Sequence, residues 1–446
     1  MRDPRWSIAL GLSLLAAACG GDDSGDNAGA GGGGGVGGNG ACVGGGKGTF
    51  DVRIKIDSGV PGDVTFKAAS GFQQDVVNNT KIEIAAGQYS VEARRVTMMG
   101  LIVGRAYSAK PVAPVCLVPG STQPVTIEYK LEPGSQKLWF AGGVEGVHTA
   151  AFDAADLSTS AEIAASVKLS DALTDPRALA FDRMGNLWVA DQSGSLQMYG
   201  RDSLGVSRAS APEVVLSGTS LCQALVPCGP RALAFDNEGG VWVALSDQVA
   251  HFPASQLLAT GEPQADVTLS GPDVSAPSAL ALDAAGSLWI TNADAGVAKF
   301  NAARLLTSSA EPADVVLTGS TPEPVVSELS TPTTLAFDAD GALWVGYFGS
   351  NVVARYEPDL LEMGGAVTPS VQLQVDVLAL IESMAFDDSG SLWIGGSAGK
   401  IARISVTQLM AGGDPSVDAV TLTSADVSHA VGLAFDPPAK LTPIAR

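Results

Sequence analysis

Residues 335–345 read LAFDADGALWV, and this stretch decides the fold because the chain repeats it. Its Leu and Phe stand two residues apart, so in a strand both side chains point to one face of a sheet. The Asp then opens a turn, because its carboxylate can accept hydrogen bonds from backbone amides two residues further on. The Gly supplies the positive φ that the turn needs, and an apolar strand centred on Trp follows. Four further copies occur, at 179–189, 233–243, 280–290 and 384–394.

Each copy is followed by two more strand-like segments. Third strands are expected at segments such as 297–300 and 353–356, and fourth strands at segments such as 267–269 and 315–317. The Trp of the pattern recurs every 47 to 55 residues. Four antiparallel strands in a unit of about 50 residues is typical of a propeller blade.

The repeats predict six blades, one of which is shared by the two ends of the chain. The Trp strand at 138–140 has no first strand before it, whereas the first strand at 433–436 has no Trp strand after it. Joining these two strands completes a sixth blade and leaves the ring without exposed sheet edges. We therefore expect an all-β fold in which residues 137–446 form a closed six-bladed β-propeller.

The segments DADGALW (338–344) and NVVAR (351–355) resemble the repeats of NHL-type and streptogramin-lyase-like propellers, over about residues 137–440. The resemblance implies a central funnel that binds ligands, and it leaves the activity open because propellers host many unrelated functions. Lyase chemistry of the streptogramin type would need a His and Glu cluster on the late blades. Here His148 lies in the first blade, His251 lies in a strand and His429 stands alone.

The funnel is expected to be ringed by the loops that enter each first strand. The residue two places before the Leu or Met of each repeat is, in the six blades, Arg177, Arg231, Ser278, Thr333, Glu382 and Val431. Two neighbouring arginines can hold a carboxylate or a sulfate through paired hydrogen bonds. The alternative is that they form ion pairs with acidic neighbours such as Asp175, Asp191 or Glu382.

The loops between second and third strands supply further funnel candidates, which are Asp191, Asn292, Tyr347, Phe348 and Asn351. Adjacent aromatic residues in a loop can anchor a sugar or a peptide, or they can pack over the edge of the blade. Convergent carboxylates and carbonyls in the same region would suit Ca²⁺. The Asp that recurs before each Gly is instead expected to form its turn, because that place is common to the repeats.

Residues 1–18 are typical of a signal peptide. Arg2 and Arg5 accompany an apolar stretch at 6–18 that is too short to span a bilayer. The small residues that precede Cys19 resemble the lipobox of bacterial lipoproteins, with Ala16 in place of the usual Leu. The resemblance implies cleavage before Cys19 and lipidation of that residue, and ordinary secretion is the alternative.

A flexible tether is expected to follow the lipidated Cys. Residues 20–48 contain 16 Gly, so they cannot bury apolar surface, and we expect residues 19–48 to be a disordered linker. Among lipoproteins, Gly20 after the Cys implies sorting to the outer membrane. The expected location is therefore the cell envelope, lipid-anchored and facing the periplasm or the outside.

Cysteine usage agrees with an exported protein. The chain has 5 Cys, and assigning one to the lipid leaves four for an oxidising compartment. We expect the pairs Cys42–Cys116 and Cys222–Cys228. A metal site is the competing interpretation, but no two Cys have the Cys-x-x-Cys spacing.

Residues 49–133 are expected to form a small β-sandwich ahead of the propeller. Apolar and polar residues alternate at 49–56, 81–84, 89–93 and 124–129, with turn residues between these segments. A spacer or docking role is expected for this domain.

The charge is concentrated in the propeller and constrains its partners. Of a formal net charge of −21, residues 137–446 hold 14 basic and 35 acidic residues. Such a surface repels phosphate backbones, which argues against nucleic-acid binding. We expect a monomeric binding or scaffold module that recognises a protein, peptide or glycan without a cofactor. The alternative is a metal-dependent hydrolase, lactonase or lyase that uses the same funnel.

Overall fold

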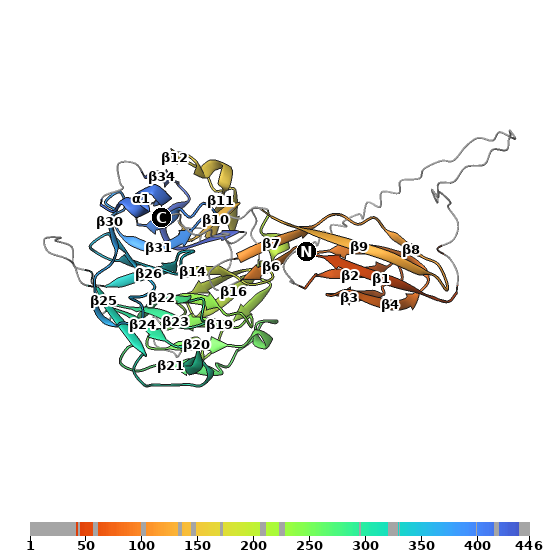
Figure 1. Ribbon diagram of the computed structural model, residues 1–446, viewed down its shortest axis with the longest axis horizontal. Coiled ribbons are helices and arrows are strands. Elements are labelled where there is room, and N and C mark those ends of the chain that lie inside the picture. The colour runs from red at the N-terminus through yellow and green to blue at the C-terminus, as the bar shows by residue number, and fades with distance from the viewer. Residues whose placement is uncertain are drawn as a thin grey trace, which may run out of the picture.

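The computed structural model describes residue 42 and residues 45–436 except 57–60, 100–103, 133–135, 144–148, 170–172, 206–210, 223–227, 294–295, 320–328, 330, 398 and 414–418. The expected signal peptide, Cys19 and nearly all of the linker 19–48 lie outside the described residues, as does His148. Within the described part, no helix has the length and hydrophobicity to cross a membrane. Figure 1 shows two bodies of β-sheet joined end to side, an elongated one before residue 133 and a rounder one after it.

The elongated body contains two sheets that pack face to face. The first has the strand order β4-β1-β9-β7-β6 and the second β3-β2-β5-β8. Their bounds are β1 (Lys47–Lys55), β4 (Thr80–Ala85), β6 (Val96–Met99), β7 (Gly104–Ala109), β9 (Thr122–Leu131), β2 (Val64–Ala68), β3 (Gln73–Val76), β5 (Gly87–Ala93) and β8 (Val115–Leu117). The first strand thus begins at Lys47, inside the expected linker.

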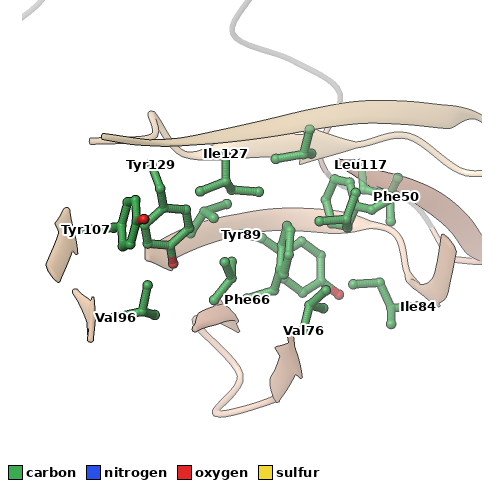
Figure 2. Close-up of a cluster of buried hydrophobic side chains, with 14 residues drawn as sticks. Phe50, Phe66, Val76, Ile84, Tyr89, Val96, Tyr107, Leu117, Ile127 and Tyr129 are labelled. Atoms are coloured by element: carbon green, nitrogen blue, oxygen red, sulfur yellow. The ribbon is translucent and has the colours of Figure 1, made fainter. Parts of the chain in front are cut away.

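Aromatic side chains from both sheets fill the space between them (Figure 2). Phe50 on β1 stacks against Phe66 on β2 with ring centroids 5.0 Å apart, and Tyr89 on β5 meets Phe50 edge-on at 5.5 Å. The alternating burial of β1 and β9 follows the period of two in their sequences. This core confirms the small β-sandwich predicted before the propeller.

Two disulfides are present, and both match the pairs expected from the sequence. Cys42 is bonded to Cys116, which ties the segment before β1 to strand β8. Cys222 is bonded to Cys228 and closes a short loop after β17 (Val214–Leu216).

The rounder body is a six-bladed β-propeller. Each blade is named here by its position in the ring, with its strands given from the inside outward. They are blade 1, β35 (Val427–Asp436), β10 (Lys137–Gly143), β11 (Thr149–Asp153) and β13 (Val167–Leu169); blade 2, β14 (Pro176–Phe181), β15 (Leu187–Asp191), β16 (Ser195–Tyr199) and β17; blade 3, β18 (Ala232–Phe235), β19 (Val241–Ala244), β20 (Val249–Phe252) and β21 (Val267–Leu269); blade 4, β22 (Pro277–Leu282), β23 (Leu288–Asn292), β24 (Gly296–Phe300) and β25 (Val315–Gly319); blade 5, β26 (Pro332–Phe337), β27 (Leu343–Tyr347), β28 (Val352–Tyr356) and β30 (Val371–Gln374); and blade 6, β31 (Ile381–Phe386), β32 (Leu392–Gly396), β33 (Lys400–Ile404) and β34 (Val420–Thr423).

The two ends of the propeller sequence close the ring as predicted. Strand β35 pairs antiparallel with β10, with Leu138 opposite Phe435 and Trp139 opposite Ala434. The inner strands β35, β14, β18, β22, β26 and β31 contact one another in ring order. Blade 1 is therefore assembled from residues about 300 apart in the chain, and no inner strand is left at an edge.

The recurrent Asp does more than form its turn. In blade 5, Asp338 accepts the backbone amides of Asp340 and Ala342 through Oδ1, both at 3.0 Å. Its Oδ2 accepts the indole Nε1–H of Trp344 at 3.0 Å. Blades 2, 4 and 6 repeat the Asp–Trp bond at 2.8 to 3.0 Å. In these four blades the carboxylate thus fixes the turn and orients the indole. The Trp ring packs edge-on against the Phe of the next blade at five of the six blade boundaries.

An outer ladder of parallel pairing also links the blades, and the sequence pattern does not predict it. After each third strand the chain makes a helical turn or loop, and five such connections then pair with the outermost strand of the preceding blade. The regular pairs are β25 with β29 (Gly365–Val367) and β34 with β12 (Ala161–Glu162). Single bridges at the same place are Leu216–Gly261, Leu269–Ser309 and Leu373–Gly413. The helices among these connections are η1 (Ala154–Leu157), η2 (Arg201–Ser203), η3 (Ala254–Gln256), η4 (Ala302–Leu306) and α1 (Val406–Ala411).

Ion pairs join the sandwich to the propeller beside blade 1. Arg95 of the sandwich donates to Glu132 at 2.9 Å and to Asp436, the last residue of β35, at 3.0 Å. Arg201 of the propeller reaches Asp63 of the sandwich at 3.1 Å. Burial at this junction raises the pKa of Asp436, although the charge of Arg95 opposes the rise. Asp436 bonds Arg95, and the indole nitrogen of Trp139 in the same blade is buried with no hydrogen-bond partner among the described residues.

Candidate binding site at the propeller axis

A β-bulge at the start of the inner strands produces the ring of residues predicted at the funnel. In blades 2, 4, 5 and 6 the inner strand skips one residue in its pairing with the second strand, and that residue is Arg177, Ser278, Thr333 or Glu382. A bulge leaves one residue out of the ladder and re-aims its side chain. We call this end of the propeller the bulge face, and the opposite end, where the Asp turns lie, the turn face.

The six predicted ring positions line one small cavity on the axis, with a volume of about 100 Å³. Deeper along the axis the same cavity meets an apolar ring, whose six members are each between 6% and 9% exposed: Leu179, Leu233, Leu280, Leu335, Met384 and Leu433. The site is therefore a shallow polar pit above an apolar floor. A cavity of this size accommodates one small group of a ligand rather than a whole sugar or peptide.

The two arginines of the ring have different surroundings. Arg177 forms an ion pair with Asp175 at 2.9 Å, but both side chains are more than 40% exposed, so the pair is weak. Arg231 on the neighbouring blade has no ion pair among the described residues. The Nε atoms of both arginines are buried without a hydrogen-bond partner in the described structure. The expected structural pairing of these arginines thus holds only for Arg177.

Glu382 faces the arginines from the other side of the ring, because blade 6 stands opposite blade 3. Its Oε1 lies 3.2 Å from Nδ1 of His429, so His429 does not stand alone as the sequence suggested. Its Oε2 is buried and has no partner among the described residues. The pit therefore presents guanidinium donors on one side and an unpaired carboxylate oxygen on the other.

The hydroxyls of the ring are used to join blades. Ser278 donates toward the carbonyl of Pro332 at 3.4 Å and contacts Thr291 at 2.8 Å. Thr333 donates to the carbonyl of Ile381 on blade 6 at 3.1 Å. These two side chains hold neighbouring inner strands together, which leaves the charged residues as the groups most available to a ligand.

Asp191 and Asn292, two of the expected ligand-binding residues, are buried side chains that bond the loops of their own blades. Both are fully buried at the ends of second strands. Asp191 accepts the backbone amides of Thr174, Asp175 and Ser193 at 2.6 to 3.1 Å. Asn292 accepts the amide of Ser275 and donates to the carbonyl of Asp273. Each side chain thus pins the loop that enters its own blade.

The two adjacent aromatics point to opposite sides of their strand end. Tyr347 is 2% exposed, and its hydroxyl lies 2.7 Å from that of Tyr356 in the core. Burial raises the pKa of Tyr347 well above its usual value and that of Tyr356 to about 12. Tyr347 therefore belongs to the core, whereas Phe348, at 42% exposure, remains a surface candidate.

Asn351 holds the loop between the second and third strands of blade 5. It has a φ of 54°, a left-handed conformation that Asn tolerates better than most residues. Its Nδ2 donates to the carbonyl of Leu378 at 3.1 Å, while its Oδ1 is buried without a partner in the described structure. One polar atom of this side chain is therefore unsatisfied near the bulge face.

The donor set at the axis does not fit the divalent metal that the lactonase or lyase alternative would need. The ring supplies one carboxylate, two guanidinium groups, two hydroxyls and a Val, and Ca²⁺ or Mg²⁺ requires several convergent oxygens free of neighbouring cations. Throughout the described residues, no group of three or more His, Cys, Asp or Glu side chains is arranged to hold a metal ion.

Comparisons with solved structures return proteins of low identity. A protein of unknown function from Bacteroides caccae is 12% identical, with 68% of this chain and 99% of that chain covered and a TM-score of 0.46. A streptogramin B lyase is 14% identical, with 54% and 68% covered and a TM-score of 0.37. A catalytically inactive virginiamycin B lyase from Staphylococcus aureus with quinupristin is 14% identical, with 61% and 78% covered and a TM-score of 0.40. No protein-family model and no curated protein matches the sequence. The propeller follows from the strand pairing of the chain itself, and these similarities assign no activity.

Proposed function

We propose that this chain is an envelope-anchored lipoprotein whose propeller is a binding or scaffold module. Its binding site is the pit on the bulge face, and the recognised feature is an acidic group on a peptide, protein or glycan. Cys19 carries the lipid, residues 20–48 act as the tether, and the chain works as a monomer without a cofactor. The sandwich then serves as a spacer between the tether and the propeller.

The observation that carries the proposal is Arg231, which lies next to Arg177 on the neighbouring blade and has no acidic partner among the described residues. An unpaired guanidinium beside a second one is arranged to hold a carboxylate or sulfate through charge-assisted hydrogen bonds. The unpaired Oε2 of Glu382 across the pit is placed to accept a hydroxyl or ammonium next to that acidic group. Exposed Phe348 on the same face offers an apolar surface for the rest of the ligand.

Binding of acidic probes by the purified full-length chain tests the site. D-glucuronate and N-acetyl-aspartate are titrated by calorimetry, with glucose and N-acetyl-alanine as neutral counterparts. Loss of a charge-assisted pair of hydrogen bonds by Arg231→Ala should weaken binding about 10- to 100-fold. Arg183→Ala, an exposed arginine in an Asp turn on the opposite face, is the matched control and should bind as the wild type does. Equal effects of the two variants, or no preference for the acidic probes, would refute the proposal.

Two further measurements address the anchor and the enzymatic alternative. Cys19→Ser should move the protein from the membrane fraction to the soluble fraction and abolish incorporation of labelled palmitate. Metal analysis of the purified chain should find no stoichiometric divalent ion. A chelator-removable ion in a one-to-one ratio would instead favour the hydrolase, lactonase or lyase.

A further inference from the structure

A second cavity lies on the turn face, between blades 3 and 4, and its volume is about 550 Å³. Asp236, His251 and Asp266 of blade 3 form one wall. Leu282, Leu305 and Leu306 of blade 4 form the other. This volume falls in the range that encloses a small organic ligand.

Side chains at two repeat positions leave room for the cavity at this blade boundary. One of them, the third-strand position opposite the Trp, varies among the repeats and is Ala151 in blade 1 and Met198 in blade 2. At the other five boundaries a Phe of the next blade packs against the Trp, whereas blade 4 carries the shorter Leu282. On the third strand, the residue opposite the Trp is Lys299, Arg355 or Arg403 in blades 4 to 6, and its cationic group lies 5.4 to 6.0 Å from the ring. Blade 3 has His251 there, whose ring packs on Trp242 and reaches no further.

The carboxylates that serve the long cation in blade 5 are kept in blade 3. Arg355 pairs with Asp338 at 2.9 Å and with Asp340 at 3.8 Å. The same turn positions in blade 3 are occupied by Asp236 and Glu238, and both line the cavity. The acidic half of the arrangement is therefore present, while the arginine is missing.

His251 takes the place of the arginine beside Asp236, but it forms no ion pair with Glu238 among the described residues. Its Nε2 lies 2.8 Å from Asp236 and its Nδ1 lies 2.6 Å from Asp266, so both ring nitrogens are engaged with carboxylates. One imidazolium then faces two carboxylates, and exposed Glu238 adds a third negative charge. Asp266 is 46% exposed, so its carboxylate is open to solvent as well as to the histidine.

We propose that this cavity is a binding site for a small organic cation, an amidine, guanidine or amine on an aryl or alkyl body. The cationic group pairs with Asp266 and Glu238, in the place that an arginine takes in blade 5. The body lies against Leu282, Leu305 and Leu306, the last of which is 78% exposed in the unliganded chain. The site is on the face opposite the arginine pit, so it does not rest on the function proposed above.

Benzamidine tests the proposal, with the uncharged isostere benzamide as the matched ligand control, both titrated into the full-length chain by calorimetry. Benzamidine should bind with one-to-one stoichiometry, and benzamide should bind at least tenfold more weakly. His251→Arg introduces the side chain that blades 5 and 6 carry at this position and fills the cavity, so it should lower benzamidine affinity at least tenfold while the chain still folds. Ala285→Trp, which blocks the cavity from its exposed rim, should do the same without touching the carboxylates.

A variant of the axial pit separates the two sites. Glu382→Gln removes the unpaired carboxylate on the bulge face and should leave benzamidine binding unchanged. Equal binding of benzamide, undiminished binding by both blocking variants, or loss of binding in Glu382→Gln would each overturn the proposal.

Discussion

Replacing Asp338 by Ala should destabilise the propeller more than the same change in another blade. The Asp338 side chain is 1% exposed and accepts four hydrogen bonds. One of them comes from Nε of Arg355 at 2.9 Å, and Arg355 is also 1% exposed. The substitution thus removes one carboxylate from a buried guanidinium, which keeps Asp340 and Glu357 as partners, and it leaves an indole N–H and two backbone amides without their acceptor.

The magnitude follows from comparison with Asp283 in blade 4. Asp283 bonds the same turn amides and the indole of Trp289, but the cation of that blade, Lys299, pairs with Glu362 instead. Asp283→Ala therefore leaves only neutral donors unsatisfied, at a cost of about 1–3 kcal/mol. Breaking a buried ion pair costs about 3–5 kcal/mol, and the lower end applies here because Asp340 and Glu357 remain beside Arg355, so Asp338→Ala should be the more damaging substitution by about 1 kcal/mol.

Urea unfolding of both variants, followed by Trp fluorescence, measures the difference. The double variant Asp338→Ala with Arg355→Met also removes the buried guanidinium. It should recover part of the lost free energy of unfolding, because an apolar pair in place of a buried ion pair is often tolerated. If Asp338→Ala were no more destabilising than Asp283→Ala, the assignment of Asp338 as the partner of a buried cation would be wrong.

Three further outcomes are expected. Deletion of the chain from Val431 onward removes most of β35 and should abolish the cooperative melting of the propeller; a truncated chain that melts at the wild-type temperature would contradict the closure. A Cβ at Gly432 would lie 3.0 Å from Cα of Ala178 on blade 2, so Gly432→Val should cost about 1–3 kcal/mol in unfolding free energy, whereas Gly205→Ala, in open space, should be close to neutral. Burial alone would lower the pKa of His251, but its two carboxylate partners outweigh burial and raise it. The stability from this charge is then full below about pH 6.5 and is lost as pH rises through the raised pKa, so Tm should fall between pH 6 and pH 9 in the wild type and stay flatter in His251→Gln.

The blade architecture could be predicted because the residues within each repeat determine its strands and its turn. Alternating apolar residues, an Asp able to cap a turn and a Gly able to take positive φ leave few other conformations for an LAFDADGALWV stretch. Gly341 does have a φ of 81°, as its turn position requires. Closure of the ring was also predictable, since an unmatched Trp strand at 138–140 and an unmatched first strand at 433–436 complete each other.

The outer ladder of parallel pairing could not be read in the same way. It joins the outermost strand of one blade to a loop of the next through backbone groups, as between Leu269 and Ser309. Backbone pairing of one to three residues imposes no side-chain period. The outer-strand partner is Leu at all five places and the loop partner is Gly at three, but a single Leu or Gly does not by itself predict a pairing. Such contacts depend on how far each blade is rotated against its neighbour, which a local pattern does not encode.

The candidate site was predicted in position but not in accessibility. The ring with Arg177, Arg231 and Glu382 could be placed because one alignment of the repeats fixes the same position in every blade. Asp191 and Asn292 were placed among the ligand-binding candidates because the sequence does not distinguish a polar strand-end residue that contacts a ligand from one that bonds its own loop. Only the direction of the side chain separates the two roles.

Departures from the repeat locate the specialised parts of this molecule better than the repeat itself does. Where the pattern is kept, as in blade 5, the Asp bonds both the Trp and the cation. In blade 1, Asp436 bonds Arg95 of the sandwich and thereby couples the two domains. The indole nitrogen of Trp139 in that blade has no hydrogen-bond partner among the described residues. In blade 3, His251 leaves a cavity beside carboxylates whose counterparts in blade 5 pair with an arginine. The two departures therefore mark places where the propeller meets another body, the sandwich at blade 1 and, as proposed above, a ligand at blade 3.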